Sequence, residues 1–180
     1  PPGGLKGAIA RIGHDDLWRI ATRVSLESSV FKVAGMEDLV EEIRVHSFAV
    51  AEVTAWMAGE KRGPNYLVGL LHDVGKFVVL RCAVTSRRTP DPHPEFVGDI
   101  VQRFHPALSV LVAHAWQLGP MACAAMGYHH DPRKTPKEHR RTAFYLYLAD
   151  IVAHGAAAER QGMPSRAREV LGNLKGIRFD

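Results

Sequence analysis

The pattern of apolar positions along the chain predicts helices and very little strand. Apolar side chains recur every three or four residues over most of the sequence, which is the period of a helix that packs along one face. Strands would show strict alternation or a hairpin turn such as Asn-Gly, and neither signal is present. We therefore expect an all-α protein, a helical bundle of roughly seven to eight helices, with residues 1–180 in a single domain.

Prolines and glycines indicate where these helices begin and end. Pro64 and Pro106 are each expected to open a helix in its first turn, and Gly119 is expected to end one. Residues 85–94 contain three prolines and are expected to form an exposed loop. The predicted helices lie at about 17–31, 39–57, 64–78, 95–103, 106–118, 121–128, 136–151 and 164–174.

The composition is that of an ordinary globular protein. Hydrophobic residues make up 46% of the chain and charged residues 23%, and 180 residues can bury a sizeable core. No apolar run approaches the ~20 residues that cross a bilayer, and no signal peptide is recognisable, so no membrane partner is expected. Two cysteines, Cys82 and Cys123, are too few for a disulfide framework, which favours a reduced, cytoplasmic protein. The chain opens on Pro1 without an initiator methionine, so we expect a fragment.

The charge distribution gives no support to a nucleic-acid partner. The formal net charge is only +4, and a nucleic-acid footprint would need a broad basic face. We interpret the densest basic cluster as a solvated loop and helix start: Arg133, Lys134, Lys137, Arg140 and Arg141.

One pair of residues stands out against this background. His72 and Asp73 lie in the middle of an apolar helical stretch, and Lys76 follows three residues after the aspartate. Burying a carboxylate beside an imidazole is unfavourable unless both groups find a partner. A divalent metal ion is a natural partner, because it accepts imidazole nitrogen and carboxylate oxygen together.

Other polar residues occupy similarly apolar positions, and the chain has ten histidines in all. A single histidine on an apolar face is usually a core residue with satisfied hydrogen bonds, but an aspartate in an apolar helix usually has a specific partner. Several such residues on different helices favour one shared site for one or two divalent ions, such as Fe, Mn or Zn. The candidate metal ligands are Glu42, His46, His72, Asp73, His105, His129, His130 and Asp150.

Two of these residues are also candidates for catalysis. Two divalent ions could bind a phosphate ester for attack, with Asp73 between the ions and Lys76 neutralising charge on the phosphoryl oxygens. The alternative for Lys76 is an ordinary exposed helix lysine. His114 should point away from any site that His105 enters, and His154, one turn beyond Asp150, is a candidate to support the ligands from outside.

The candidate residues also form an ordered series of motifs. The motifs are His46-Ser47-Phe48-Ala49-Val50-Ala51, Gly69-Leu70-Leu71-His72-Asp73-Val74-Gly75-Lys76, His105-Pro106, Tyr128-His129-His130-Asp131-Pro132 and Leu148-Ala149-Asp150. In this order they resemble the HD superfamily, and most closely the HDOD family, the HD-related output domain of bacterial signalling proteins. Residues 5–13 are also similar to the HDOD segment that precedes the HD-like core.

The resemblance implies a bacterial regulatory domain whose partner is a signalling protein or a small phosphate-containing ligand. HDOD proteins usually carry a further N-terminal helical portion, which this sequence lacks, and many have lost metal ligands that this chain keeps. The related HD-GYP phosphodiesterases share the ordered ligands, including a glutamate that matches Glu42, but their Gly-Tyr-Pro signature is absent after His130.

Three functions are compatible with the sequence. The first is an HDOD-type signal-transduction domain with an intact HD-type divalent-metal site. The second is a metal-dependent phosphohydrolase that acts on a nucleotide, a cyclic dinucleotide or another phosphate ester. The third is a helical scaffold without metal. Fold class alone does not separate them, because function depends on the site.

Overall fold

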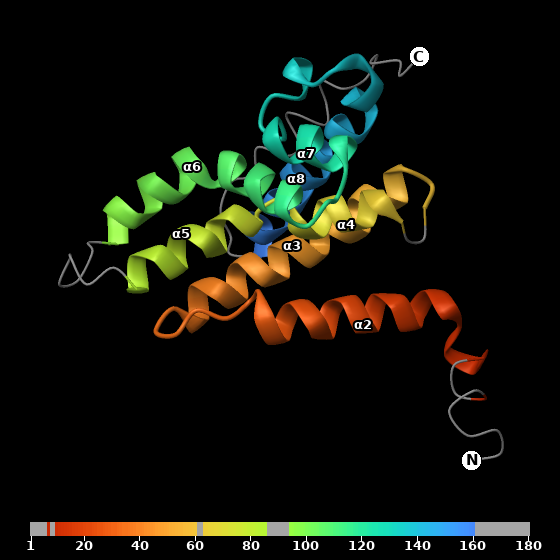
Figure 1. The fold of residues 1–180 in the computed structure, drawn as a ribbon, viewed down its shortest axis with the longest axis horizontal. Helices are drawn as coiled ribbons and strands as arrows, with labels where there is room; N and C mark the ends of the chain where they lie inside the picture. Colours follow the sequence, from red (N-terminus) through yellow and green to blue (C-terminus); the bar gives the residue numbers. More distant parts are fainter. Residues whose placement is uncertain (1–6, 8–9, 61–62, 86–93, 161–180) are drawn as a thin grey trace.

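The fold is described here from a computed structural model, which defines residue 7 and residues 10–60, 63–85 and 94–160. These parts contain helices and connecting turns but no strand, so the all-α prediction is confirmed (Figure 1). The α-helices are α2 (His14–Ser29), α3 (Glu37–Met57), α4 (Pro64–Leu71), α5 (Val74–Thr85), α6 (Pro94–Ala115), α7 (Pro120–Gly127) and α8 (Arg140–Arg160), and two 3₁₀ turns, η1 (Pro132–Lys134) and η2 (Lys137–His139), precede α8.

The central helix of the bundle is α3, which packs on α4 and α8, while α5 packs on α6 and α6 on α7 (Figure 1). The core between these helices is apolar and includes the fully buried Val50, Leu80 and Leu146. Gly69 lets α4 approach α3 closely, because a Cβ atom at this position would lie 2.7 Å from the Cα atom of Ala51. No helix in the described parts of the chain has the length and apolar character to span a membrane.

Several of the predicted helix boundaries are wrong. The predicted helix from Pro64 does not continue through residues 72 and 73, because the chain turns there between α4 and α5. The predicted break before Pro106 does not occur either, and α6 runs from Pro94 to Ala115 with Pro106 inside it. His105 therefore lies in the middle of a helix rather than at its start. A proline removes one backbone donor from a helix, but α6 is held on both sides of Pro106 by its packing against α5.

Gly75 of α5 packs directly against the backbone of α6. Its backbone N–H donates a hydrogen bond to Ser109 Oγ at 2.9 Å, and a Cβ atom at residue 75 would lie only 2.1 Å from the carbonyl oxygen of His105. The two backbones are therefore in direct contact where the His72–Asp73 turn ends. The long helix predicted from Pro136 begins instead at Arg140, after η2, and the helix predicted at 164–174 lies outside the described residues.

Arg81 of α5 and the Phe31–Phe77 contact join the end of α2 to α5. The guanidinium of Arg81 donates hydrogen bonds to the carbonyl oxygens of Ser29, Val30 and Lys32. The last carbonyl groups of a helix have no partner within it, so a donor from another element stabilises the helix end. Phe31 completes the attachment, since its ring centroid lies 4.9 Å from that of Phe77.

Replacing Arg81 by methionine should lower the free energy of unfolding by about 1 kcal/mol, because the variant keeps the apolar stem but removes the donors. Urea unfolding monitored by circular dichroism measures the change. Arg103→Met is a matched control, because Arg103 is an exposed arginine on α6 whose guanidinium lies over the neighbouring Phe104 ring. Equal effects of the two substitutions would contradict this role of Arg81.

Candidate metal centre

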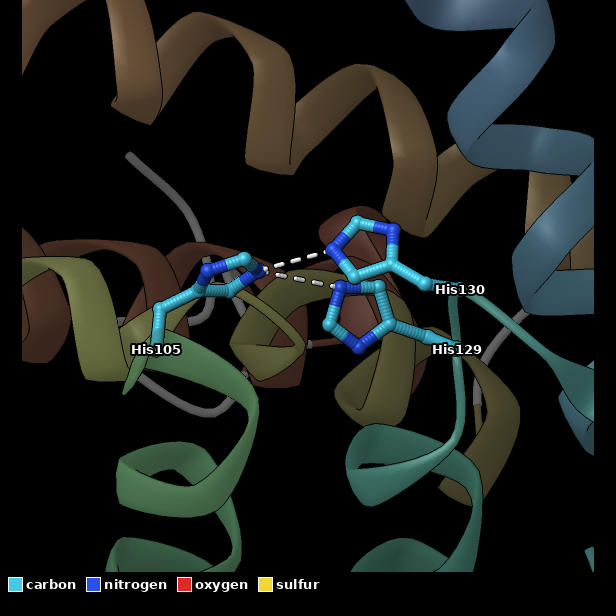
Figure 2. A group of neighbouring side chains, drawn as sticks. All are labelled: His105, His129 and His130. Atoms are coloured by element: carbon cyan, nitrogen blue, oxygen red, sulfur yellow. Dashed lines mark hydrogen bonds between the residues drawn. The ribbon is translucent and has the colours of Figure 1, made fainter. Parts of the chain in front are cut away.

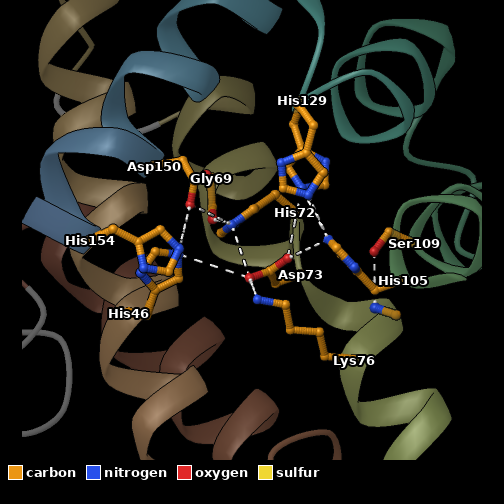
Figure 3. Close-up of polar contacts among 12 residues, drawn as sticks. His46, Gly69, His72, Asp73, Lys76, His105, Ser109, His129, Asp150 and His154 are labelled. Atoms are coloured by element: carbon orange, nitrogen blue, oxygen red, sulfur yellow. Dashed lines mark hydrogen bonds and ion pairs between the residues drawn. The ribbon is translucent and has the colours of Figure 1, made fainter. Parts of the chain in front are cut away.

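Seven of the eight candidate ligands meet in the middle of the bundle (Figures 2 and 3). They come from α3, from the turn between α4 and α5, from α6, from the end of α7 and from α8. The eighth, Glu42, is exposed, and the structure gives it no contact with the other seven. The seven are His46, His72, Asp73, His105, His129, His130 and Asp150.

The ligand atoms form an outer and an inner group, and a third group of His72, Asp73 and His129 joins the two. The outer group consists of His46, His72 and Asp150, and the inner group of His105, His129 and His130; within each group one ligand atom per residue lies within 4.8 Å of the others. In the outer group His46 Nε2 lies 2.9 Å from Asp150 Oδ1. In the inner group His105 Nε2 lies 3.0 Å from His130 Nε2 and 3.3 Å from His129 Nε2 (Figure 2). Such donor sets suit divalent Zn, Fe or Mn.

Asp73 lies between the two groups and turns one oxygen to each. Its Oδ2 atom lies 3.3 Å from His72 Nε2 of the outer group, and its Oδ1 atom lies 3.3 Å from His105 Nε2 of the inner group. The side chain is only 2% exposed. A carboxylate in this position can contact a cation in each group, as the sequence predicts for this residue.

Three of the imidazoles are oriented by backbone carbonyl groups. The Nδ1–H groups of His72, His105 and His129 donate to the carbonyl oxygens of residues 69, 101 and 126, at 2.8, 2.8 and 2.6 Å. Residues 69 and 126 lie in the last turns of α4 and α7, where carbonyl groups lack partners within the helix. These contacts assign the proton to Nδ1 and leave the Nε2 lone pair directed at the centre, as is usual for histidines that bind metal.

Buried nitrogen and oxygen atoms of the site lack a hydrogen-bond partner within the described part of the chain, and a bound cation would provide a partner for them. With Nδ1 protonated on both His105 and His129, their Nε2 lone pairs face each other at 3.3 Å. Two lone pairs at this distance repel unless a cation or a proton lies between them. The buried atoms His72 Nε2 and Asp73 Oδ1 have no hydrogen-bond partner among the described residues. Buried polar atoms are rarely left without a partner, so these residues fit a divalent cation better than a metal-free core.

The pKa values of His105 and His129 are shifted in the opposite direction from that of His72. Burial, together with the neighbouring His72, lowers the pKa of His129 to about 3, and burial also lowers the pKa of His105. Burial acts on His72 in the same direction, but the Asp73 charge and contacts with Asp150 outweigh it and raise its pKa to about 10. The two carboxylates therefore favour positive charge at His72 Nε2, and a divalent cation bound among these atoms would supply that charge.

Both carboxylates stay ionised in this environment. Burial alone would raise the pKa of Asp73, but the neighbouring charge of His72 holds it well below its ordinary value. Asp150 behaves in the same way, because its hydrogen bond with His46 and the nearby charge of His72 outweigh burial and lower its pKa. Negative charge for a cation is thus present at neutral pH in both groups.

Lys76 and His154 complete the site on its outer side (Figure 3). Lys76 is not an exposed helix lysine: its side chain is 12% exposed and its Nζ lies 2.5 Å from Asp73 Oδ2. His154 was predicted from its one-turn spacing to support the ligands from outside, and its Nε2 lies 3.4 Å from Asp150 Oδ1. His114, by contrast, is exposed on α6 and contacts none of these residues.

A groove leads from the surface to the outer group. Its volume is about 840 Å³, and it lies between α3, α5, α6 and α8. His46, Lys76 and His154 form its inner end, and Glu42 lines it farther along α3. A small ligand could therefore reach the outer group from solvent.

Comparisons with known proteins agree with this fold. The HDOD domain family matches residues 4–132, which include all the candidate ligands except Asp150. A crystal structure of a provisionally assigned metal-dependent phosphohydrolase from Shewanella amazonensis SB2B is similar, with a TM-score of 0.70 and 17% identity. The alignment covers 97% of this chain and 64% of that chain, so this chain spans less than two thirds of that protein. At this identity the likeness concerns the fold. No curated protein matches the sequence.

Proposed function

The chain belongs to the HDOD family, and from this premise we propose that it is a signal-transduction domain that binds one or two divalent metal ions at the centre described above. The observation that carries the proposal is the set of three buried imidazoles whose Nδ1–H groups are held by backbone carbonyls while their Nε2 atoms converge. A core histidine without a metal would use both ring nitrogens for hydrogen bonds.

The residues have distinct roles in this proposal. The outer group would hold one ion, the inner group would hold a second, and Asp73 would contact both. The ions would be Fe, Mn or Zn, because imidazole and carboxylate ligands suit these metals. The signal would pass to a protein partner, or would depend on a small phosphate-containing ligand that enters the groove.

A metal-dependent phosphohydrolase is the second candidate, and the groove is the observation that favours it. When bound, divalent ions supply Lewis acidity toward a phosphate ester. Lys76 lies at the inner end of the groove, where its ammonium group could contact phosphoryl oxygens. However, that ammonium group is already paired with Asp73, and the groove is lined by Glu42 as well, so a strongly anionic substrate meets little free positive charge.

Elemental analysis of the purified full chain tests the metal centre. We expect one to two equivalents of Fe, Mn or Zn per chain, and a fall in melting temperature when a chelator removes them, because a ligand that binds only the folded state stabilises it. Protein that contains less than a tenth of an equivalent after purification, and takes up no metal from a solution of Mn²⁺ or Zn²⁺, would overturn the proposal.

A phosphatase assay separates the two candidate functions. Metal-loaded protein is expected to release no phosphate from a generic ester such as p-nitrophenyl phosphate with Mn²⁺ above the level of the His129→Ala variant. His129 belongs to the inner group, so true catalysis would be lost in that variant. Release by the wild type that the variant lacks would favour the phosphohydrolase over the signalling domain.

A further inference from the structure

His154 lines the inner end of the groove. It lies directly against the outer group, beside His46 and Asp150 (Figure 3). Its Nε2 atom lies 3.4 Å from Asp150 Oδ1. Its ring stacks on that of His46, with centroids 4.2 Å apart and 32° between the ring planes. The side chain is 62% exposed, so it faces the groove and the outer group at the same time.

Three imidazoles converge on one carboxylate oxygen in this region. The Nε2 atoms of His46, His72 and His154 lie 2.9, 3.7 and 3.4 Å from Asp150 Oδ1. A carboxylate oxygen has two lone pairs, so it cannot accept good hydrogen bonds from all three nitrogens. The ligand atoms of His46, His72 and Asp150 lie within 4.8 Å of one another, and His154 adds a third imidazole nitrogen beside the same carboxylate oxygen. Divalent Zn and Fe accept such a set of donors well.

We infer that His154 is a further protein ligand of the outer metal ion and that it closes the position through which a ligand from the groove would reach that ion. This inference rests on the proposed metal centre. Metal sites that act on substrates keep a position free of protein ligands, whereas structural sites fill their positions with side chains. Without His154 the outer ion would be open toward the groove, and with it the ion is covered from that side.

The exposed position of His154 would allow its side chain to leave the outer ion and return to it. Because the side chain lies on the solvent side of the outer group and is exposed, it can leave without disturbing the core, unlike the fully buried His72. An oxyanion such as inorganic phosphate in the groove would compete with it for the ion. The resting centre would then bind metal tightly and phosphate poorly, which suits a signalling domain better than a hydrolase.

Cobalt substitution of the full-length chain tests the inference, because Co²⁺ reports its ligands by absorption. His154→Cys should produce a thiolate-to-Co²⁺ charge-transfer band in the near ultraviolet that the wild type lacks. His154→Ala should bind its outer Co²⁺ at least about tenfold more weakly than the wild type. Added inorganic phosphate should change the visible Co²⁺ spectrum of His154→Ala more than that of the wild type, since the inner group contributes equally to both.

His114 offers a matched control, since it is an exposed histidine of α6 that contacts no residue of the site. His114→Cys should give no charge-transfer band, and His114→Ala should bind Co²⁺ and phosphate as the wild type does. No thiolate band in His154→Cys, together with equal affinity and equal phosphate response in His154→Ala and wild type, would overturn the inference while leaving the metal centre in place. A wild type that takes up no Co²⁺ at all would overturn the metal centre and this inference with it.

Discussion

Replacing Asp73 by alanine is expected to abolish metal binding at both groups at once. Its two oxygens face opposite groups, so its loss removes a ligand from both. The metal content of the purified variant, measured by elemental analysis, should fall from the wild-type value to below a tenth of an equivalent. Asp73→Asn should behave similarly, because it keeps the shape of the side chain but removes the charge.

The same variant should lose the stability that metal confers. A ligand present at about a thousand times its dissociation constant stabilises a folded protein by roughly 4 kcal/mol. For a protein of this size that corresponds to a difference of roughly 8–16 °C between the melting temperatures with metal and with chelator. Differential scanning fluorimetry with and without EDTA should show this difference for the wild type and none for Asp73→Ala.

Asp99 supplies the control for this experiment, because it is an exposed aspartate of α6 outside the site. Asp99→Ala should keep both the metal and the chelator-dependent shift. An Asp73→Ala protein that is folded and still carries the wild-type amount of metal would contradict the assignment of the whole centre, since the carboxylate between the groups would then be dispensable.

The residues that gather at the centre could be predicted from the sequence because each breaks a local pattern. His46 occupies an apolar position of α3, and Asp150 lies in an apolar stretch of α8. Burying such groups is unfavourable without a partner, so their presence on several helices indicates one shared partner. The all-α fold was predictable for the complementary reason, since the helical period persists through these polar positions.

The arrangement of the helices around the site could not be predicted in the same way. Nothing in the local pattern marks a turn at His72–Asp73, because the apolar spacing continues across it from α4 to α5. The proline rule also failed at Pro106, because packing against α5 sustains the helix that a proline would otherwise end. In both places a contact between distant segments outweighed the local signal.

Glu42 and His154 show the limit of reasoning from helical spacing. Glu42 precedes His46 by one turn and shares its face, yet it lines the groove and belongs to none of the groups of close ligand atoms. His154 has the same spacing from Asp150 and reaches the outer group. Spacing along one helix defines which residues share a face, but the packing of the helices decides which of those residues reach the site.

The contact between Gly75 and α6 suggests a second variant with a large effect. Gly75→Ala should lower the free energy of unfolding by about 3 kcal/mol, near the upper end for an overpacked core. The added Cβ atom would lie 2.1 Å from the carbonyl oxygen of His105 and 2.8 Å from the backbone nitrogen of Ser109. No change of rotamer relieves a clash with backbone atoms, so α5 and α6 would have to separate. Urea unfolding of the metal-free protein measures the loss directly.

The same separation should reach the metal centre, because His105 Nε2 lies only 3.3 Å from Asp73 Oδ1 across this contact. Gly75→Ala should therefore bind its inner metal more weakly as well as unfold more easily. Gly98→Ala is the matched control: Gly98 also lies in a helix, its added Cβ atom would meet no atom within 4 Å, and the gain in helix propensity should stabilise the protein by about 0.5–1 kcal/mol. A loss of stability for Gly75→Ala and a gain for Gly98→Ala would show that the close approach of α5 to α6 holds His105 against Asp73. Similar small changes in the free energy of unfolding for both variants would mean that the helices can move apart without disturbing the site.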